Sequence, residues 1–206
     1  MATPEVPRLV LASASKARLR VLRDAGFEPE VVVSGVDEDV GDLRTTEAVA
    51  LLAERKASAV APLCERALVL GCDSLLELEG MSLGKPASGA EVVATWRHLS
   101  NRQGRLHTGH CLIDTNSERR VGDVASTLIW FGSPSDEELE AYAARDEALQ
   151  LAGAFSIEGH GGSFVDGIDG SLSNVLGLSL PLFRSLLSEL GVRITDLWSE
   201  RPQPPT

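Results

Sequence analysis

The chain has 206 residues, of which 43% are hydrophobic and 24% charged, proportions that are ordinary for a globular protein with a sizeable core. Its 30 acidic residues outnumber 19 basic ones, and the net charge of −11 disfavours general nucleic-acid binding. A secretion signal and a membrane-spanning helix are not expected, because residues 1–8 lack a cationic and apolar leader and no apolar run approaches ~18 residues.

Cysteine usage bears on the cellular compartment. Cys64, Cys72 and Cys111 are far apart in the sequence and form no Cys-x-x-Cys pair. This pattern favours reduced thiols over a disulfide or zinc framework. We therefore expect a cytoplasmic protein without a membrane partner.

Strand-like and helix-like segments alternate in the first half of the chain. β-branched and apolar runs predict strands at residues 8–13, 30–36 and 67–72. Helical spacing predicts helices over residues 16–26, where Gly26 takes the C′ position, and over residues 45–61. A hairpin with Gly80 in its turn is expected at residues 75–84.

The second half pairs strands locally and ends in a helix. Capping boxes at Ser88/Glu91 and Ser135/Glu138 mark two helix starts. Two long strands are expected at residues 106–114 and 124–132. A last helix is expected at residues 179–191, followed by a disordered tail from about residue 199. These elements predict an α/β protein with a mixed sheet, folded as one domain over residues 1–206.

A cationic helix start follows the first strand. This acidic chain places four cations within residues 16–23, where the helix dipole gives no reason for them: Lys16, Arg18, Arg20 and Arg23. A bound phosphate would explain these cations. Backbone N–H groups, the Ser15 hydroxyl and the guanidinium of Arg18 would hold it. The structural alternative is Ser13 or Ser15 as a plain N-cap, with the arginines solvated on the surface.

Carboxylates follow two apolar runs. Asp73 is expected to leave a buried strand at its carboxyl end, where open α/β sheets bind their ligands. A carboxylate there can bind Mg²⁺ or deprotonate water. Glu38 lies in an acidic loop with Asp37 and Asp39. The alternatives are a turn or cap role for Asp73 and a solvated surface for the loop.

Lysines, histidines and glycines are individually less informative. Lys85 lies in a Gly-Lys-Pro loop and Lys56 on a helix, and solvent exposure is the commoner role for each. His107 and His110 are expected on opposite faces of a strand, which is the wrong setting for a zinc site, and at least one should pack or face solvent. The glycine-rich stretch at residues 152–171 fits close approach of the backbone to a ligand, or tight bulges.

Taken in order, eight segments resemble the Maf family of nucleoside triphosphate pyrophosphatases: "LASASKARLRVL", "VDE", "AERKA", "LGCDS", "LGKP", "LHTG", "AGAFSIEG" and "NVLGLSLPL". The resemblance runs from about Leu9 to Gly191. It implies an elongated α/β fold, shared with inosine triphosphatases, with a central mixed β-sheet flanked by helices. It also implies hydrolysis of a nucleoside triphosphate between the α and β phosphates, with a divalent cation such as Mg²⁺ or Mn²⁺.

The resemblance assigns roles to the candidates that match the family's motifs. It implies that Ser15 and Arg18 contact the phosphates and that Lys56 and Lys85 neutralise the triphosphate. Glu38 and Asp73 would hold the metal, with Asp73 as the catalytic proton acceptor.

Two substrate-binding positions depart from relatives that act on dTTP and UTP. Ser74 replaces a threonine, and Glu158 replaces a glutamine. Ala17 also stands where those relatives have an arginine. Glu158 and "HTG" are similar to the branch of the family that acts on 7-methylguanosine triphosphate, so the base is left open.

Two other functions compete with hydrolysis. A nucleotide-binding regulator with little turnover, related to cell division, would need the cations but no general base. A nucleotidyltransferase would transfer the nucleotide instead of releasing the monophosphate. The sequence also leaves the oligomeric state open, with a homodimer as one option.

Overall fold

The computed structural model describes residues 7–145, 148–149 and 151–199. The tail expected to be disordered lies outside these ranges except for Ser199, whose N–H donates to the carbonyl of Gly26 at 2.8 Å. One seven-stranded sheet has the order β2-β1-β3-β5-β6-β7, and β4 pairs with β3. Strands β1, β2 and β3 are parallel and the other pairings antiparallel, which confirms the α/β class and the mixed sheet.

The strands are β1 (Arg8–Leu11), β2 (Glu30–Val31), β3 (Ala67–Leu78), β4 (Met81–Leu83), β5 (Gln103–Asp114), β6 (Arg119–Phe131) and β7 (Val165–Asp169). The α-helices are α1 (Lys16–Asp24), α2 (Thr45–Val60), α3 (Gly89–Leu99), α4 (Asp136–Ala143), α5 (Leu172–Val175) and α6 (Leu180–Glu189). Short 3₁₀ helices are η1 (Ala61–Leu63), η3 (Ala152–Ala154), η4 (His160–Phe164) and η5 (Ile194–Leu197). No described helix has the length and apolar character needed to cross a membrane.

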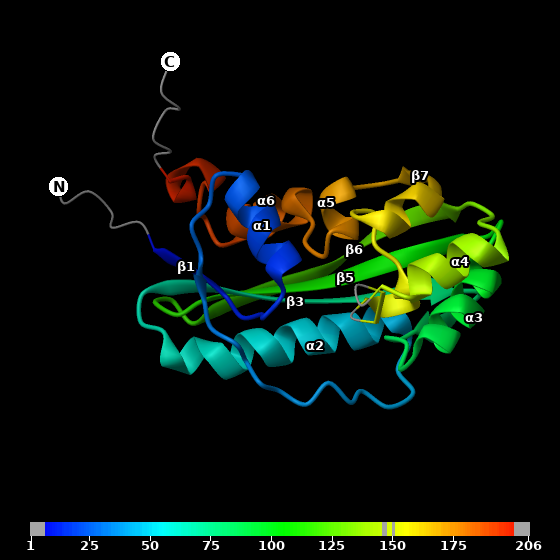
Figure 1. Ribbon diagram of the computed structural model, residues 1–206. Helices are drawn as coiled ribbons and strands as arrows, with labels where there is room; N and C mark the ends of the chain where they lie inside the picture. Colours follow the sequence, from blue (N-terminus) through cyan, green and yellow to red (C-terminus); the bar gives the residue numbers. More distant parts are fainter. Residues whose placement is uncertain (1–6, 146–147, 150, 200–206) are drawn as a thin grey trace, which may run out of the picture.

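Helices cover both faces of the sheet (Figure 1). Helix α2 lies on one face, α1, α5 and α6 lie on the other, and α3 and α4 lie together at one end (Figure 1). Two glycines bring α2 onto the strands. A Cβ atom at Gly71 would lie 2.2 Å from the carbonyl oxygen of Ala53, and one at Gly109 would lie 2.1 Å from that of Val49. The backbone of α2 therefore rests directly on β3 and β5.

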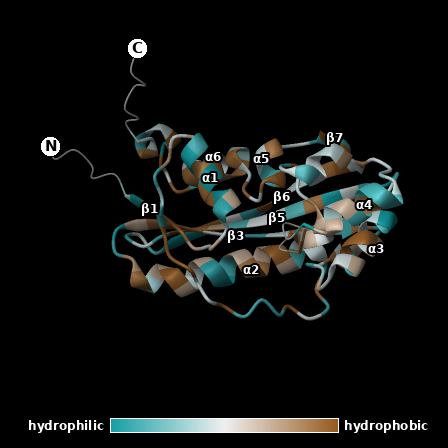
Figure 2. Cartoon of the chain, viewed as in Figure 1, coloured by the Kyte–Doolittle hydropathy of each residue, from teal (hydrophilic) through white to brown (hydrophobic). Residues whose placement is uncertain are grey.

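The buried apolar residues form three clusters. One joins β1 and β3 to α1 and α6, the second joins the same strands to α2, and the third, around Trp96, lies at the end that α3 and α4 cover. Helix α2 carries hydrophilic as well as hydrophobic residues along its length (Figure 2). The three cysteines are free and buried within these layers.

Local helix signals are largely confirmed. Ser15 caps α1, and Gly26 follows that helix with a φ of +90°. Ser135 and Glu138 form the predicted capping box at the start of α4. At α3 only half of the box forms, because the carboxylate of Glu91 accepts from the N–H of Ala87 instead of Ser88.

Strands β2 and β3 differ in length from the expectation. Strand β2 stops at Val31, because residues 31–44 contain no buried side chain and so form no face for a sheet to bury. Strand β3 instead continues through Leu78 and supplies the first arm of the predicted hairpin, whose turn is Glu79–Gly80 with φ values of +52° and +83°.

Candidate active site

Lys56 joins the two predicted carboxylates. Its Nζ lies 2.6 Å from Oδ1 of Asp73 and 2.6 Å from Oε1 of Glu38. Because both oxygens contact the same nitrogen atom at 2.6 Å, the distance between them is at most twice that value. Lys56 is buried, so the helix-surface role expected for it is wrong. It lies on the face of α2 that rests against the sheet, where a lysine needs charged partners.

Asp73 lies inside a strand and not at its end, which corrects the expectation. On one side of β3, residues 67–70 pair with β1 and residues 76–78 pair with β4. Within the described part of the sheet, residues 71–75 pair with neither of these strands on that side. The neighbouring strand β1 ends at Leu11, so the strand end beside Asp73 is the carboxyl end of β1 and not of β3.

Arg18 is buried and bonded to protein on three sides. Its Nε donates to the carbonyl of Gly177 at 2.8 Å, Nη1 to Oγ of Ser13 at 3.0 Å and Nη2 to Oγ of Ser74 at 3.1 Å. The solvated arginine of the structural alternative is therefore wrong for this residue. The backbone of Gly177, at φ +96°, folds over the guanidinium, and this tertiary contact has no local sequence signal. A guanidinium has more N–H donors than these three contacts use, so a phosphate can still be bound.

The predicted serines take part in the same network. Oγ of Ser15 accepts from the N–H of Arg18 at 3.3 Å, which makes Ser15 the N-cap of α1. Oγ of Ser13 lies 3.2 Å from the N–H of Ser15. Oγ of Ser74 lies 2.9 Å from Oγ1 of Thr108. Contact of Ser15 and Ser74 with a substrate remains a prediction.

Positive charge gathers around Glu38. A hydrogen bond from Lys56 lowers the pKa of Glu38, partial burial opposes this, and the charges of Lys56, Lys85 and Arg18 lower it further. Lys85 is exposed, and its loop is held where the N–H of Gly153 donates to the carbonyl of Gly84 at 2.9 Å. The structure thus brings Glu38, Asp73 and three predicted cations into one region.

Glu158 is joined to α1 instead. Its carboxylate forms an ion pair with Arg20, and both side chains are about half-exposed. Arg20 lies two residues after Arg18 on the same helix, so Glu158 is linked to the element that presents the phosphate-site arginine.

A sequence model described as Maf-like protein matches residues 8–190. The chain belongs to the Maf family. Relatives called nucleoside triphosphate pyrophosphatase include those of Streptomyces avermitilis, 54% identical with 94% of this chain and 96% of the relative covered, and Streptomyces coelicolor, 54% identical with 93% and 95% covered. The relative of that name from Nostoc punctiforme is 47% identical, with 94% and 99% covered. The predicted family is confirmed.

The two carboxylates of this Maf chain fit a divalent cation only in part. Mg²⁺ is commonly held by one or two carboxylates together with substrate phosphates. Glu38 and Asp73 are close enough to share an ion, but the described residues contain no group of three or more His, Cys, Asp or Glu that could hold a metal. The two carboxylates therefore fit an ion whose remaining ligands come from a bound triphosphate.

Sequence reasoning missed the hydrogen-bonded residues that lie behind Ser74, beginning with Thr108. Oγ1 of Thr108 donates to the carbonyl of Asn174, whose Nδ2 donates to Oγ1 of Thr127 at 3.0 Å. His110 is also buried, and its Nε2 accepts from the N–H of Ser179 at 2.8 Å. The signal was present in the alternation of "LHTGH", which places Thr108 and His110 on one strand face. His107 lies on the opposite face, as expected, and is buried as well.

The glycine-rich segment packs on protein. A Cβ atom at Gly153 would lie 2.4 Å from Cδ2 of Leu76, and its φ of +66° favours glycine. Close approach of the backbone to a ligand, or tight bulges, were expected there, and at Gly153 the close neighbour is a side chain of strand β3. The hydrogen bond from the N–H of Gly153 to the carbonyl of Gly84 joins the segment to the Lys85 loop.

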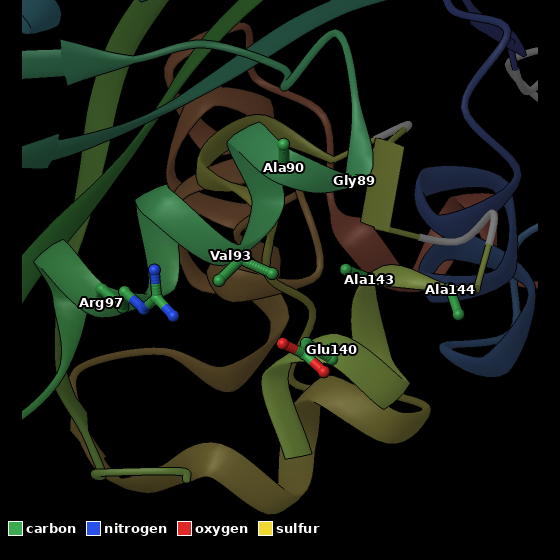
Figure 3. Close-up of a pocket in the computed structure, with 7 residues that line it drawn as sticks. All are labelled: Gly89, Ala90, Val93, Arg97, Glu140, Ala143 and Ala144. Carbon is green, nitrogen blue, oxygen red and sulfur yellow. The ribbon is translucent and has the colours of Figure 1, made fainter. Parts of the chain in front are cut away.

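A separate groove lies between α3 and α4 (Figure 3). It is lined by Gly89, Ala90, Val93, Arg97, Glu140, Ala143 and Ala144. Arg97 pairs with Asp136, and the lining contains none of the predicted site residues. The groove therefore offers no counterpart to the charged cluster around Lys56.

Proposed function

We propose that this chain is a nucleoside triphosphate pyrophosphatase that hydrolyses its substrate to the monophosphate and pyrophosphate. The observation that carries this is the buried Lys56 held between Asp73 and Glu38, with Arg18 and Lys85 nearby. Membership of the Maf family and the name of the relatives support it.

In the proposed mechanism Asp73 accepts the proton of the attacking water. Its side chain is largely buried and is positioned by Lys56. Lys56, Lys85 and Arg18 stabilise the negative charge that develops on the departing pyrophosphate. Positioning and electrostatics supply most of the rate, since phosphoryl chemistry needs little covalent help.

Glu38 and Asp73 would also hold the divalent cation, Mg²⁺ or Mn²⁺. When bound, the ion would supply Lewis-acid activation and charge neutralisation at the phosphates. A phosphate oxygen would then join the two carboxylates as a partner of the Lys56 ammonium, which has three N–H donors. The two carboxylates thus hold the Lys56 ammonium at the place where the triphosphate charge would lie.

The decisive experiment separates the scissile bonds. The protein is incubated with a panel of ordinary and modified triphosphates plus Mg²⁺ or Mn²⁺, and pyrophosphate and orthophosphate are resolved. We expect pyrophosphate with the matching monophosphate. Stepwise orthophosphate release would indicate an ordinary triphosphatase, tight binding without turnover a regulator, and a transferred nucleotide a nucleotidyltransferase.

We propose that Glu158 helps to select the base. A carboxylate can accept hydrogen bonds from a guanine-like edge or attract a cationic base, and Arg20 limits its net charge. Glu158→Gln should change the relative rates among bases more than the shared triphosphate chemistry. Glu137→Gln, on the exposed face of α4, is the matched control. Parallel changes for all substrates would remove Glu158 from selectivity.

We propose that the enzyme acts in the cytoplasm on free nucleotides. The net charge of −11 opposes nucleic-acid binding, and the three buried thiols suit a reducing compartment. A homodimer remains a prediction, which light scattering on the purified chain would measure.

A further inference from the structure

The loop that carries Glu38 has no core of its own. Residues 31–44 include no buried side chain, and the loop runs past α2 as the long blue segment of Figure 1. Apolar burial therefore does not fix the place of Glu38, and polar contacts must do so. Ordering such a loop is costly, since each residue loses backbone freedom.

Arg55 contacts the loop on both sides of Glu38. Its Nη1 lies 2.7 Å from the carbonyl oxygen of Asp39 and 3.4 Å from that of Asp37. The next residue of α2 is Lys56, which binds the carboxylate of Glu38 itself. Arg55 thus holds the backbone on either side of Glu38, and the next residue, Lys56, holds the Glu38 side chain.

The ion pair to Lys56 holds the carboxylate of Glu38 but makes no contact with the backbone of the loop. The Glu38 side chain is 58% exposed, so water competes for its carboxylate. The N–H of Asp39 donates to Oδ1 of Asp37, and that of Gly41 to Oδ1 of Asp39, but these bonds shape the turn without joining it to the rest of the protein. A charged donor on backbone carbonyls supplies that attachment.

The attachment spans open space instead of a packed contact. Arg55 lines a groove between the loop and α2 together with Val36, Asp37, Asp39, Ser58 and Ala59. Its guanidinium bridges this groove to reach the two carbonyls. Loss of the guanidinium would therefore release the loop while leaving the buried core of α2 in place.

We infer that Arg55 is a positioning residue that holds Glu38 beside Lys56 and Asp73 by clamping the backbone on either side of it. The inference rests on the proposed function, because it assigns Arg55 a part in the same site. Arg55 touches no substrate and acts only through Glu38.

A double-mutant cycle tests this. Arg55→Met keeps the aliphatic stem and removes the donors, and it should lower kcat/KM about tenfold, the range of one charge-assisted hydrogen bond. In a Glu38→Gln background the same change should cost less than about twofold, because its target is gone. Arg55→Lys should restore part of the loss. An equal loss in both backgrounds would overturn the inference.

Arg120→Met is the matched control. Arg120 pairs with Glu54, the residue before Arg55, so the variant removes the same charge beside the same turn of α2 without touching the loop. It should keep wild-type kcat/KM. An Arg120→Met loss equal to that of Arg55→Met would show that charge, and not positioning, is responsible.

Hydrogen exchange gives a readout that does not depend on turnover. In Arg55→Met the amides of Asp39 and Gly41 should exchange faster, while those of β3 keep their protection. Unchanged exchange at Asp39 and Gly41 would overturn the clamp. If the wild-type protein released no pyrophosphate, the proposed function would fail, and exchange would still decide the role of Arg55.

Discussion

At the residue scale, Asp73 and Lys56 form one charged unit, and the enzyme function depends most on its carboxylate. Asp73→Asn keeps the shape but cannot take a proton, so turnover should fall by ~10² to 10⁴-fold. Triphosphate binding through Arg18 and Lys85 should partly survive. Single-turnover hydrolysis at saturating Mg²⁺, with calorimetry on a non-hydrolysable analogue, measures both. A near wild-type rate would make Glu38 the next candidate base.

Arg18 contributes to stability as well as to the site. Its removal takes one hydrogen-bond donor each from the carbonyl of Gly177 and the hydroxyls of Ser13 and Ser74. Arg18→Ala should lower the free energy of unfolding by about 2–4 kcal/mol, in addition to weakening substrate binding. A solvated arginine, the alternative that the sequence offered for this position, would have little effect on folding when removed. Urea unfolding measures the change.

Arg20→Ala is the control for Arg18. Arg20 lies on the same helix but is half-exposed, so its loss should change the free energy of unfolding by no more than about 0.5 kcal/mol. Equal effects of the two substitutions would contradict the structural role of Arg18.

At the scale of elements, the contact between α2 and the sheet sets the position of Lys56. Gly71→Ala would place a methyl group 2.2 Å from the carbonyl oxygen of Ala53, so α2 must move. We expect a loss of about 2 kcal/mol or more in the free energy of unfolding. Turnover should also fall, because Lys56 lies one turn beyond Ala53. Thermal unfolding and steady-state kinetics check the two effects.

Gly84→Ala is the matched control for this substitution. An added Cβ atom at Gly84 meets nothing within 4 Å. Its free energy of unfolding should therefore stay within about 0.5 kcal/mol of wild type. A stable and active Gly71→Ala protein would show that α2 can shift without consequence for the site.

At the scale of the whole molecule, acid stability depends on His110, which joins β5 to the start of α6. Its Nδ1–H donates to the carbonyl of Thr108 at 3.0 Å, and its Nε2 accepts from Ser179, so the folded state requires the neutral ring. Burial lowers the pKa of His110 from 6.5 to about 4. The unfolded chain binds the proton first, so stability is lost as the pH falls from 6.5 toward 4.

The expected loss from His110 over that interval is about 3 kcal/mol. His110→Gln should flatten the dependence of the free energy of unfolding on pH in this window, even if the variant is less stable at neutral pH. Burial also lowers the pKa of His107, which adds a contribution of the same sign. Urea unfolding between pH 7 and pH 4 compares the two curves. Parallel curves would exclude His110 as the source.

Most helix ends could be predicted from the sequence alone. The Ser15 cap, the Gly26 terminus and the Ser135 capping box each satisfy backbone groups within a few residues, so their patterns predict them without knowledge of the fold. The ordered motifs likewise identified the Maf family and the central mixed sheet. Helix caps depend on residues that are close in the sequence, so tertiary packing does not change them.

Which charges are buried, and what they contact, could not be predicted without the tertiary structure. Lys56 and Arg18 look like helix-surface cations in the sequence, yet one lies between two carboxylates and the other beneath Gly177. Asp73 is placed at a gap in pairing that β1 and β4 create together. Burial depends on which distant segments meet, and that is settled by the free energy of packing the whole chain, which no local pattern contains.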